Sequence, residues 1–284
     1  MEKLAILLST YNSSMFLKEQ MDSILNQTYE TWNLYIHDDM SDDITMSIIE
    51  EYCKKDKRVH FLADDKKRGS KGSFLWLLEK VEADYYMFCD HDDVWLSQKI
   101  ELSLKKMLEQ KDRKETPIIV ATNLKLVNKD LKVINESFWN HCHTRNKLFK
   151  DKYHYLVYNN IPGCSMLFNR IVKQYAIPCP DNTYVHDTWI ILSTLWNNGR
   201  IERIMSPLML YRQHQANLIG SKESPGILTQ VFNVPKLTEK TKKQYLSSKH
   251  FTQMSFTTFF AMKIKYLMIF HTTRFIDNLI KRLK

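Results

Sequence analysis

The chain has 284 residues, of which 44% are hydrophobic and 12% aromatic, so it can bury a core large enough for one domain with an appendage. Its five cysteines are odd in number and lack C-x-x-C spacing, which excludes a disulfide framework and a cysteine zinc site and indicates reduced thiols in the cytosol. The formal net charge of +9 lies entirely after Gly220, where residues 221–284 hold 12 Lys and Arg against 3 Asp and Glu. This imbalance points to anionic lipid or nucleic acid as a partner near the C-terminal segment, and not to a basic active site.

Apolar runs alternate with amphipathic stretches along the first 95 residues. Residues 4–8, 32–37, 59–62 and 85–89 have the composition of short buried strands. Helices are predicted over about 14–26 and 44–53, and around Phe74, Leu77 and Leu78. This β-α-β-α-β-α-β order predicts an α/β fold with a parallel sheet covered by helices, in which ligands bind beyond the carboxyl ends of the strands.

Polar residues follow each of the first three predicted strands. The residues after the strand at 4–8 supply hydroxyl groups and an aromatic ring that can stack on a nucleotide base. The carboxylates after the strand at 32–37 can accept a hydrogen bond from a base imide or a ribose hydroxyl. Basic residues and a Gly-Ser turn after 59–62 suit phosphate. The candidate nucleotide site comprises Thr10, Tyr11, Asn12, Asp38, Asp39, Arg68, Lys71 and Gly72. For the two aspartates, N-capping of the next helix is the alternative.

Three carboxylates, Asp90, Asp92 and Asp93, lie within four residues directly after the fourth predicted strand. Carboxylates this close repel one another, and a cation offsets that repulsion. Oxygen ligands suit Mg²⁺ or Mn²⁺, which usually bind one or two carboxylates together with substrate phosphates. A solvated acidic turn is the alternative. The metal site is favoured because a nucleotide site precedes these residues and a candidate base follows them.

The second half of the chain is less regular. Residues 118–124 are expected to form a fifth strand that continues through Leu126 and Val127, and the segment from 159 begins as a turn and becomes a strand by 168. Residues 135–151 show no clear period. Asp187 stands at the head of a strongly apolar helix, where it is either a residue favoured by the helix dipole or the candidate general base.

Four motifs then point to a known family: Ser9-Thr10-Tyr11-Asn12, Asp38-Asp39-Met40-Ser41-Asp42, Gly69-Ser70-Lys71-Gly72-Ser73-Phe74 and Asp90-His91-Asp92-Asp93-Val94-Trp95. In this order they resemble the family 2 glycosyltransferases over about residues 3–220, and they are most similar to the rhamnosyltransferase-like branch that builds bacterial surface polysaccharides. Met40 stands where the family usually has glycine. That departure is expected to alter the turn without removing the carboxylates.

The resemblance implies a GT-A fold, a Rossmann-like and mostly parallel sheet flanked by helices, and an enzyme that inverts the configuration of the transferred sugar. It also assigns roles to individual residues. The catalytic base would be Asp187, the ligands of Mg²⁺ or Mn²⁺ would be Asp92, Asp93 and His214, the donor-nucleotide site would gain Asp90, Asp92 and Arg212, and the sugar and acceptor pocket would contain Trp95, Gly163, Cys164 and His186.

The same resemblance implies the partners. The donor would be a dTDP- or UDP-linked sugar and the acceptor a saccharide or a lipid-linked saccharide, with no role for nucleic acid. Residues 1–3 lead directly into the first predicted strand, so no signal peptide is expected. The expected location is the cytoplasm, at the inner face of the membrane.

The expected domain organisation is a catalytic domain over 1–220, with a nucleotide-binding half at 1–95 and an acceptor-binding half at 96–220, followed by a basic helical tail over 221–284. Apolar residues recur at helical spacing in the tail, namely Phe260, Ile264, Leu267, Met268, Phe275 and Leu279. Two lysines interrupt its most apolar run, so we expect it to lie in a membrane interface and not to span a bilayer. A helix packed on the catalytic domain is the alternative.

Three other functions compete with transfer. His91-Asp92 and His186-Asp187 match the dipeptide of metal-dependent HD phosphohydrolases, a class that is all-helical. A sugar nucleotidyltransferase would carry a Gly-rich, Arg-containing loop after the first strand, where this chain has residues 9–12. A non-catalytic nucleotide-sugar-binding protein would have no need for the three carboxylates together with Asp187.

Overall fold

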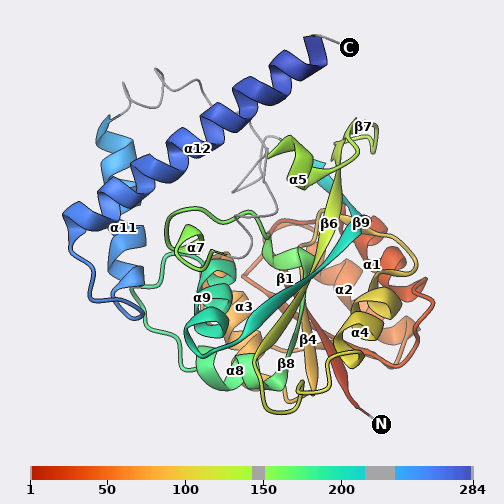
Figure 1. The fold of residues 1–284 in the computed structure, drawn as a ribbon. Helices are drawn as coiled ribbons and strands as arrows, with labels where there is room; N and C mark the ends of the chain where they lie inside the picture. The colour runs from red at the N-terminus through yellow and green to blue at the C-terminus, as the bar shows by residue number, and fades with distance from the viewer. Residues whose placement is uncertain (1, 143–150, 215–233, 283–284) are drawn as a thin grey trace.

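The computed structural model describes residues 2–142, 151–214 and 234–282 (Figure 1). Strands and helices alternate through the first 95 residues as the apolar pattern predicted. The elements of this half are β1 (Leu4–Thr10), α1 (Leu17–Leu25), β2 (Asn33–Asp38), α2 (Thr45–Lys55), β3 (Val59–Phe61), α3 (Gly69–Lys80), β4 (Tyr85–Cys89) and β5 (Val94–Trp95).

The first four strands form the parallel sheet that the sequence predicted. β1 is central: it pairs in parallel with β2 on one side and β4 on the other, so that Ile6 lies opposite Leu34 and Met87. All seven residues of β1 are buried, because neighbouring strands and helices cover the strand on both faces. β3 completes this edge by pairing in parallel with β2.

The second half of the chain extends the same sheet. Its elements are α4 (Lys99–Leu108), β6 (Ile118–Asn128), β7 (Val133–Asn135), α5 (Phe138–His141), α7 (His154–Val157), the 3-10 turn η1 (Gly163–Ser165), β8 (Met166–Asn169), α8 (Arg170–Ala176), α9 (His186–Trp196) and β9 (Arg200–Gln213). The expected strand over 118–127 and the turn that becomes a strand by 168 are both confirmed. The long strand β9 was not expected.

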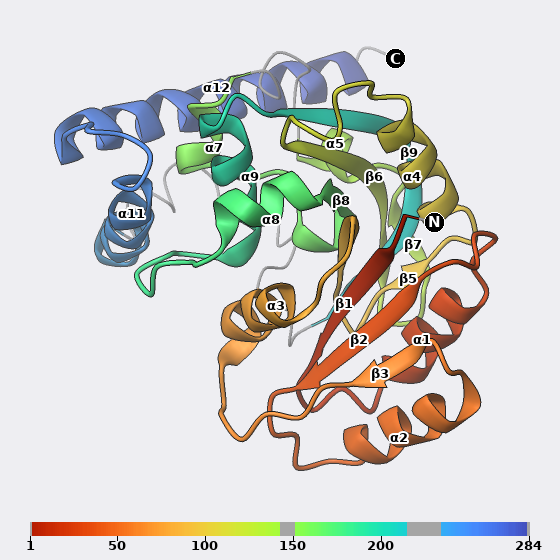
Figure 2. The same cartoon turned by 90° about the horizontal axis from the view of Figure 1, so that it is seen from below.

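The described residues form a nine-stranded sheet in the order β3-β2-β1-β4-β8-β6-β9-β5, with β7 paired to β6. The sheet is parallel within β1 to β4 and between β6 and β9, but β8 is antiparallel to both β4 and β6. Helices α3, α8 and α9 cover one face, and α1, α2 and α4 cover the other (Figures 1 and 2). The all-helical phosphohydrolase alternative is therefore excluded.

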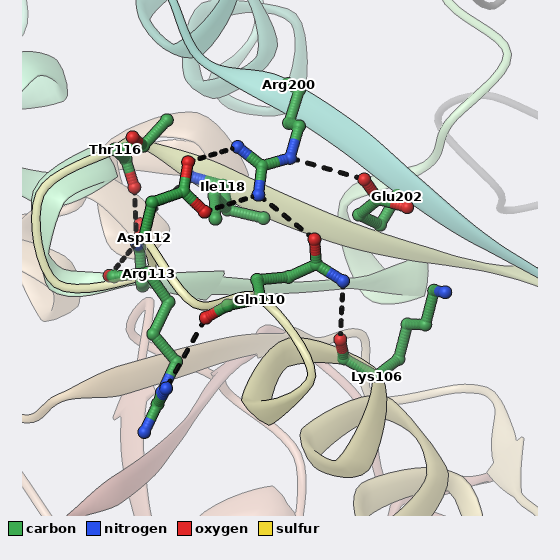
Figure 3. Close-up of polar contacts among 9 residues, drawn as sticks. Lys106, Gln110, Asp112, Arg113, Thr116, Ile118, Arg200 and Glu202 are labelled. Carbon is green, nitrogen blue, oxygen red and sulfur yellow. Dashed lines mark hydrogen bonds and ion pairs between the residues drawn. The ribbon is translucent and has the colours of Figure 1, made fainter.

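The start of β9 is fixed to the loop before β6 by the network in Figure 3. The guanidinium of Arg200 donates to both carboxylate oxygens of Asp112 at 2.7 and 2.6 Å and to Gln110 at 3.0 Å. Arg200 also donates to Glu202 at 3.3 Å. Because Ile118 lies opposite Arg200 in the ladder, this cluster sets the register of the parallel pair β6–β9 at its first residue.

The tail is helical, as expected, and consists of α11 (Val234–Ser248) and α12 (Phe256–Arg282). Figures 1 and 2 place both helices beside α7 and α9, away from α1 and α2. Phe259 and Tyr266 are buried, and the hydroxyl of Tyr266 donates to Asp151. The packed-helix alternative thus holds for this part of α12. Within the described ranges, no helix combines the length and hydropathy needed to cross a bilayer.

Candidate active site

The loops after β1 and β2 are joined by hydrogen bonds between the residues predicted to bind nucleotide. One oxygen of Asp38 accepts from the hydroxyls of Thr10 and Ser41, each at 2.7 Å. The amide of Asn12 donates to the Ser41 hydroxyl, and the Asn12 side chain accepts from the amide of Asp42. The carboxylate of Asp38 therefore holds the two loops at a fixed separation, while the ring of Tyr11 stays 43% exposed.

Asp39 caps the start of α3. Its two oxygens accept from the amides of Arg68 at 2.5 Å and Gly69 at 2.9 Å. The alternative left open by the sequence was capping of the next helix, α2, whereas this carboxylate accepts from amides at the start of α3, 30 residues further along the chain. The next residue, Met40, adopts a left-handed backbone with φ of 64°, the conformation for which glycine is the usual choice.

The basic residues after β3 are engaged with neighbouring loops. Arg68 pairs with Asp64, and the ammonium of Lys71 donates to the carbonyls of Asp181 and Thr183 at 3.0 and 2.9 Å. Lys71 thus connects α3 to the loop that leads into α9. Gly72 allows close packing within α3, because a Cβ there would lie 2.8 Å from Cβ of Arg68. Lys67, which the sequence did not single out, lies 4.1 Å from the centre of the Tyr11 ring.

The acidic loop after β4 is brought against the end of β9. Nε2 of His214 lies 2.8 Å from a carboxylate oxygen of Asp92. The two residues were predicted as metal ligands, and the fold places them side by side. A carboxylate and an imidazole are both ligands that Mn²⁺ accepts, so this pair fits a divalent cation.

The other two carboxylates of the loop differ in burial, because Asp90 is partly exposed and Asp93 faces the protein interior. Asp93 is fully buried, with one oxygen accepting from the amide of Arg212 at 3.0 Å. Its other oxygen has no hydrogen-bond partner among the described residues. Asp90, Asp93 and Cys164 offer ligand atoms within 4.8 Å of one another. A thiol is a poor ligand for Mg²⁺ or Mn²⁺, so this inner group fits the proposed ions less well than the Asp92–His214 pair.

Burial and mutual repulsion raise the pKa values of two carboxylates in this loop. Burial, followed by the charge of Asp92, raises the pKa of Asp90 to about 7, and the charge of Asp187 contributes in the same direction. Burial also raises the pKa of Asp93 well above its usual range. A bound cation would oppose both shifts, because it favours ionised carboxylates.

Lys99 lies beneath this loop and was not predicted. Its side chain is fully buried, and its ammonium donates to the carbonyl of Cys164 at 2.9 Å and contacts the sulfur of Met209 at 3.2 Å. Burial lowers the pKa of Lys99 to about 8. A sequence signal existed: Lys99, Ser103 and Met107 follow the i, i+4, i+8 spacing of one helix face, and all three are buried.

Arg212 and Trp95 lie deeper than the family resemblance implied. The buried guanidinium of Arg212 donates to the carbonyl of Asp92 at 2.7 Å, and it also contacts Glu19 and the carbonyl of Lys129. These contacts hold the acidic loop to α1. Trp95 is only 3% exposed, because its ring packs over the Lys99 ammonium at 4.8 Å. In this structure its ring belongs to the core and not to an open sugar pocket.

The candidate base lies in the first turn of α9. Asp187 accepts from the amide and hydroxyl of Thr188 at 2.5 and 3.2 Å, and both bonds use the same oxygen. His186 stacks on Phe74 with ring centres 4.5 Å apart. A Cβ on Gly163 would lie 2.9 Å from Nε2 of His186 and 3.5 Å from Cβ of Asp187, so only glycine lets η1 approach α9 this closely. Burial lowers the pKa of His186.

This fold is that of the GT-A glycosyltransferases. It is similar to the crystal structure of S. aureus TarS 1–349 with UDP-GlcNAc, with a TM-score of 0.64 and 14% identity over 94% of this chain and 72% of that one. It is also similar to the mannosyltransferase PcManGT of Pyrobaculum calidifontis with GDP-Man and Mn²⁺, with a TM-score of 0.58 and 12% identity over 95% and 82% of the two chains. The expected fold class is confirmed.

The chain belongs to glycosyl transferase family 2, whose sequence model matches residues 5–176. The dTDP-rhamnosyl transferase RfbG of Shigella flexneri is 25% identical over 76% of this chain and 75% of its own length. The putative teichuronic acid biosynthesis glycosyltransferase TuaG of Bacillus subtilis is 30% identical over 106 residues, which are 37% of this chain and 42% of TuaG. The family resemblance in the sequence is confirmed, and a rhamnosyltransferase is among the relatives.

Proposed function

We propose that this protein transfers a sugar from a nucleoside-diphosphate donor to a saccharide or lipid-linked acceptor in bacterial surface polysaccharide synthesis, with inversion at the anomeric carbon. One observation carries the proposal. The η1 turn connects the head of α9 to the acidic loop: a Cβ on Gly163 would lie 3.5 Å from Cβ of Asp187, and the next residue, Cys164, has its sulfur within 4.8 Å of carboxylate oxygens of Asp90 and Asp93. A candidate base thus stands beside a candidate metal loop at the edge where the predicted nucleotide residues end their strands.

The donor would bind at the loops after β1, β2 and β3. The exposed ring of Tyr11 suits stacking on a base, and Asp38 and Asp39 hold the surrounding loops in place. Either aspartate could accept a hydrogen bond from the base or the ribose, because its carboxylate oxygens have lone pairs that the contacts described above do not use. Lys71 would reach the diphosphate by exchanging its two carbonyl partners for phosphate oxygens, which are stronger partners for an ammonium.

The metal would be Mg²⁺ or Mn²⁺. Asp92 and His214 would hold it, with Asp90 nearby and Asp93 supporting the loop from the interior. This assignment moves Asp93 from the ligand position expected from the sequence to a supporting one, because its side chain is fully buried. A bound divalent cation supplies charge stabilisation for the departing nucleoside diphosphate.

Asp187 would accept the proton of the acceptor hydroxyl as that hydroxyl attacks the anomeric carbon. Thr188 fixes one carboxylate oxygen with two hydrogen bonds, and among the described residues the second oxygen receives none. That second oxygen is the one we assign to the acceptor. A single displacement from the face opposite the diphosphate inverts the configuration and forms no covalent sugar–enzyme intermediate.

The donor we favour is a dTDP- or UDP-linked sugar. The support comes from two proteins to which this chain is similar: RfbG is named a dTDP-rhamnosyl transferase, and TarS was crystallised with UDP-GlcNAc. Relatives named for undecaprenol-diphosphate acceptors support a lipid-linked acceptor. Nucleic acid has no place in this reaction.

The decisive experiment is a thermal-shift screen of nucleotide sugars with Mn²⁺, followed by a transfer assay with the donor that stabilises most. A ligand present at 100 times its Kd should stabilise the protein by about 2.7 kcal/mol. The products identify the reaction: a nucleoside diphosphate together with a glycosylated acceptor supports transfer, whereas a nucleoside triphosphate and a sugar 1-phosphate, formed from the nucleotide sugar and added pyrophosphate, support the nucleotidyltransferase alternative. Donor binding without hydrolysis or transfer would support a non-catalytic binding protein.

We also propose that the catalytic domain ends near residue 220 and that the tail holds the protein at the inner face of the membrane, within the cytoplasm. Lys242, Lys243 and Lys249 are exposed on or next to α11, where each could add about 1 kcal/mol of attraction to anionic lipid. The full-length protein should sediment with anionic liposomes, and changing these three lysines to glutamate should reduce that binding. Equal sedimentation of both proteins would remove the tail from membrane attachment.

A further inference from the structure

Three segments that carry proposed site residues meet at the buried ammonium of Lys99. The first is β5, which directly follows the acidic loop and contacts the ammonium through the Trp95 ring at 4.8 Å. The second is the η1 turn, whose Cys164 carbonyl accepts from the ammonium at 2.9 Å. The third is β9, through the sulfur of Met209 at 3.2 Å. These segments lead respectively to Asp92, to Gly163 and to His214.

The η1 turn in turn touches the head of α9. Gly163 approaches so closely that an added Cβ would lie within 3.5 Å of Asp187. The turn is short, with the amide of Ser165 donating to the carbonyl of Pro162 at 2.9 Å. A displacement of the Cys164 carbonyl would therefore move the surface against which the candidate base packs.

A side chain that only filled space here would be apolar. Burying an ammonium costs several kcal/mol unless specific partners compensate, and replacing buried charges by apolar groups of similar volume is often neutral or stabilising. The buried cation at this position therefore indicates a requirement for its charge and its hydrogen bond. Its neighbours supply the reason, because the ammonium donates to the carbonyl of Cys164, whose sulfur lies within 4.8 Å of carboxylate oxygens of Asp90 and Asp93.

We propose that Lys99 is a positioning residue, whose ammonium sets the separation between the acidic loop and the candidate base by holding the Cys164 carbonyl of the turn that touches both. Lys99 touches neither substrate nor metal in this scheme. It acts through η1 on Asp187 and through Asp90 and Asp93 on the loop that carries Asp92. The kinetic part of the test rests on the proposed transferase function.

The test compares Lys99→Met, which keeps the bulk of the side chain but removes its charge and donors, with Lys99→Arg, which keeps both. A misplacement of about 1 Å can cost about 100-fold in rate. We expect Lys99→Met to lower kcat about 100-fold while the donor KM stays within about threefold, and Lys99→Arg to recover at least about tenfold of that loss. If Lys99→Met does not fold, Lys99→Leu, which also lacks the charge and the donors, is judged by the same criteria.

The matched control is Lys173→Met. Lys173 is also a buried lysine, and its ammonium donates to the carbonyl of Val81 at 2.8 Å and to Glu82 at 2.5 Å. It lies in α8, where we assign no site residue. This variant should change the melting temperature without changing kcat. If Lys99→Met behaves like Lys173→Met, with kcat within about twofold of the wild type, Lys99 is a packing residue and the proposal is wrong.

A second readout does not depend on any enzymatic activity. Amide hydrogen exchange of the full-length protein should become at least about tenfold faster at residues 163–166 in Lys99→Met, and should stay unchanged there in Lys173→Met. Unchanged exchange at this turn in Lys99→Met would overturn the positioning role even if the protein proves to be a transferase. Faster exchange in a protein without transferase activity would keep the role of Lys99 and reject the proposed function.

Discussion

Nε2 of His214 lies 2.8 Å from a carboxylate oxygen of Asp92, although 122 residues of chain separate the two. The contact exists because β9 ends beside the acidic loop: Val94 of β5 pairs with Leu210, and the amide of Arg212 donates to Asp93. The imidazole is further fixed by the Phe16 ring, whose centre lies 5.0 Å from its own. A carboxylate and an imidazole held this firmly are preorganised for the metal site that we propose.

The first prediction concerns this pair. Asp92→Asn and His214→Ala should each raise the Mn²⁺ concentration needed for half-maximal transfer by about tenfold or more, because even the loss of an outer-shell partner costs a metal site about 10- to 100-fold. The measurement is a Mn²⁺ titration of activity after EDTA treatment. Asp130→Asn, which changes an exposed carboxylate, is the control. Full wild-type activity in excess EDTA would eliminate the metal from the mechanism.

The second prediction concerns the base. Asp187→Asn should leave nucleotide binding intact and lower kcat by roughly 10²- to 10⁴-fold, the usual share of general base catalysis. The measurement pairs isothermal titration with the nucleoside diphosphate and single-turnover transfer. His186→Ala is the informative neighbour: because its ring stacks on Phe74, we expect a lower melting temperature and a smaller loss of rate. A mild Asp187→Asn beside a severe His186→Ala would reverse the two roles.

The third prediction concerns the loss of stability at low pH. His154 is buried among the rings of Tyr155, Tyr158 and Tyr266, and burial lowers its pKa from 6.5 to about 4. Above pH 6.5 the ring is neutral whether the helices are docked or not. As the pH falls from 6.5 towards 4, only the undocked state takes up a proton, so α12 loses up to about 3 kcal/mol of its attachment to α7.

This loss should appear as a melting temperature that falls between pH 7 and pH 4.5 by more in the wild type than in His154→Phe. His250→Gln alters an exposed histidine and should keep the wild-type pH dependence. If His154→Phe and the wild type lose stability in parallel, acid acts elsewhere and the docking of α12 does not depend on His154.

The fourth prediction concerns the cluster in Figure 3. The hydrogen bonds from Arg200 hold the pKa of Asp112 below its usual range. The stability that this carboxylate contributes is therefore present at neutral pH and is lost as the pH falls below about 4, the unfolded value. Asp112→Asn should lower the urea midpoint at pH 7 and have a smaller effect in acid. Glu51→Gln, which breaks an exposed pair with Lys18 at 3.3 Å, should change the midpoint less.

The local pattern of apolar and polar residues was sufficient to predict the strands and helices in the first half of the fold. Continuous apolar runs identified β1 and β4, and the polar residues after them predicted which edge of the sheet carries the candidate site, because strand ends in a parallel sheet converge whatever the details of packing. The carboxylates, the base and His214 were found through motifs. Their mutual placement, with Asp92 on His214 and Asp93 turned inward, required the long-range pairing of β5 with β9.

The features that escaped prediction depend on contacts distant in sequence. Apolar and polar residues alternate poorly along β9. The strand also contains Pro207, which lies opposite Asn123 where the pairing with β6 shifts register. The sequence therefore lacks the regular period of a strand there. The burial of Trp95 also depends on a contact, with Lys99, that no local period reveals. The family match ends at residue 176, before Asp187 and His214.

The contact between Asp92 and His214 also determines how late during translation the candidate site can be completed. The parallel core of β1 to β4 is complete once residue 89 has left the ribosome, so that the first half can begin to fold while the rest is still being made. His214 is synthesised 122 residues after Asp92, so the acidic loop lacks its imidazole partner until then. At about 5–20 residues per second this interval lasts roughly 6 to 24 seconds. During that time the nascent chain carries three crowded carboxylates with neither His214 nor Arg212 beside them, and a ribosome-bound chain halted before residue 212 would hold the loops that we propose for the nucleotide but not the complete candidate site.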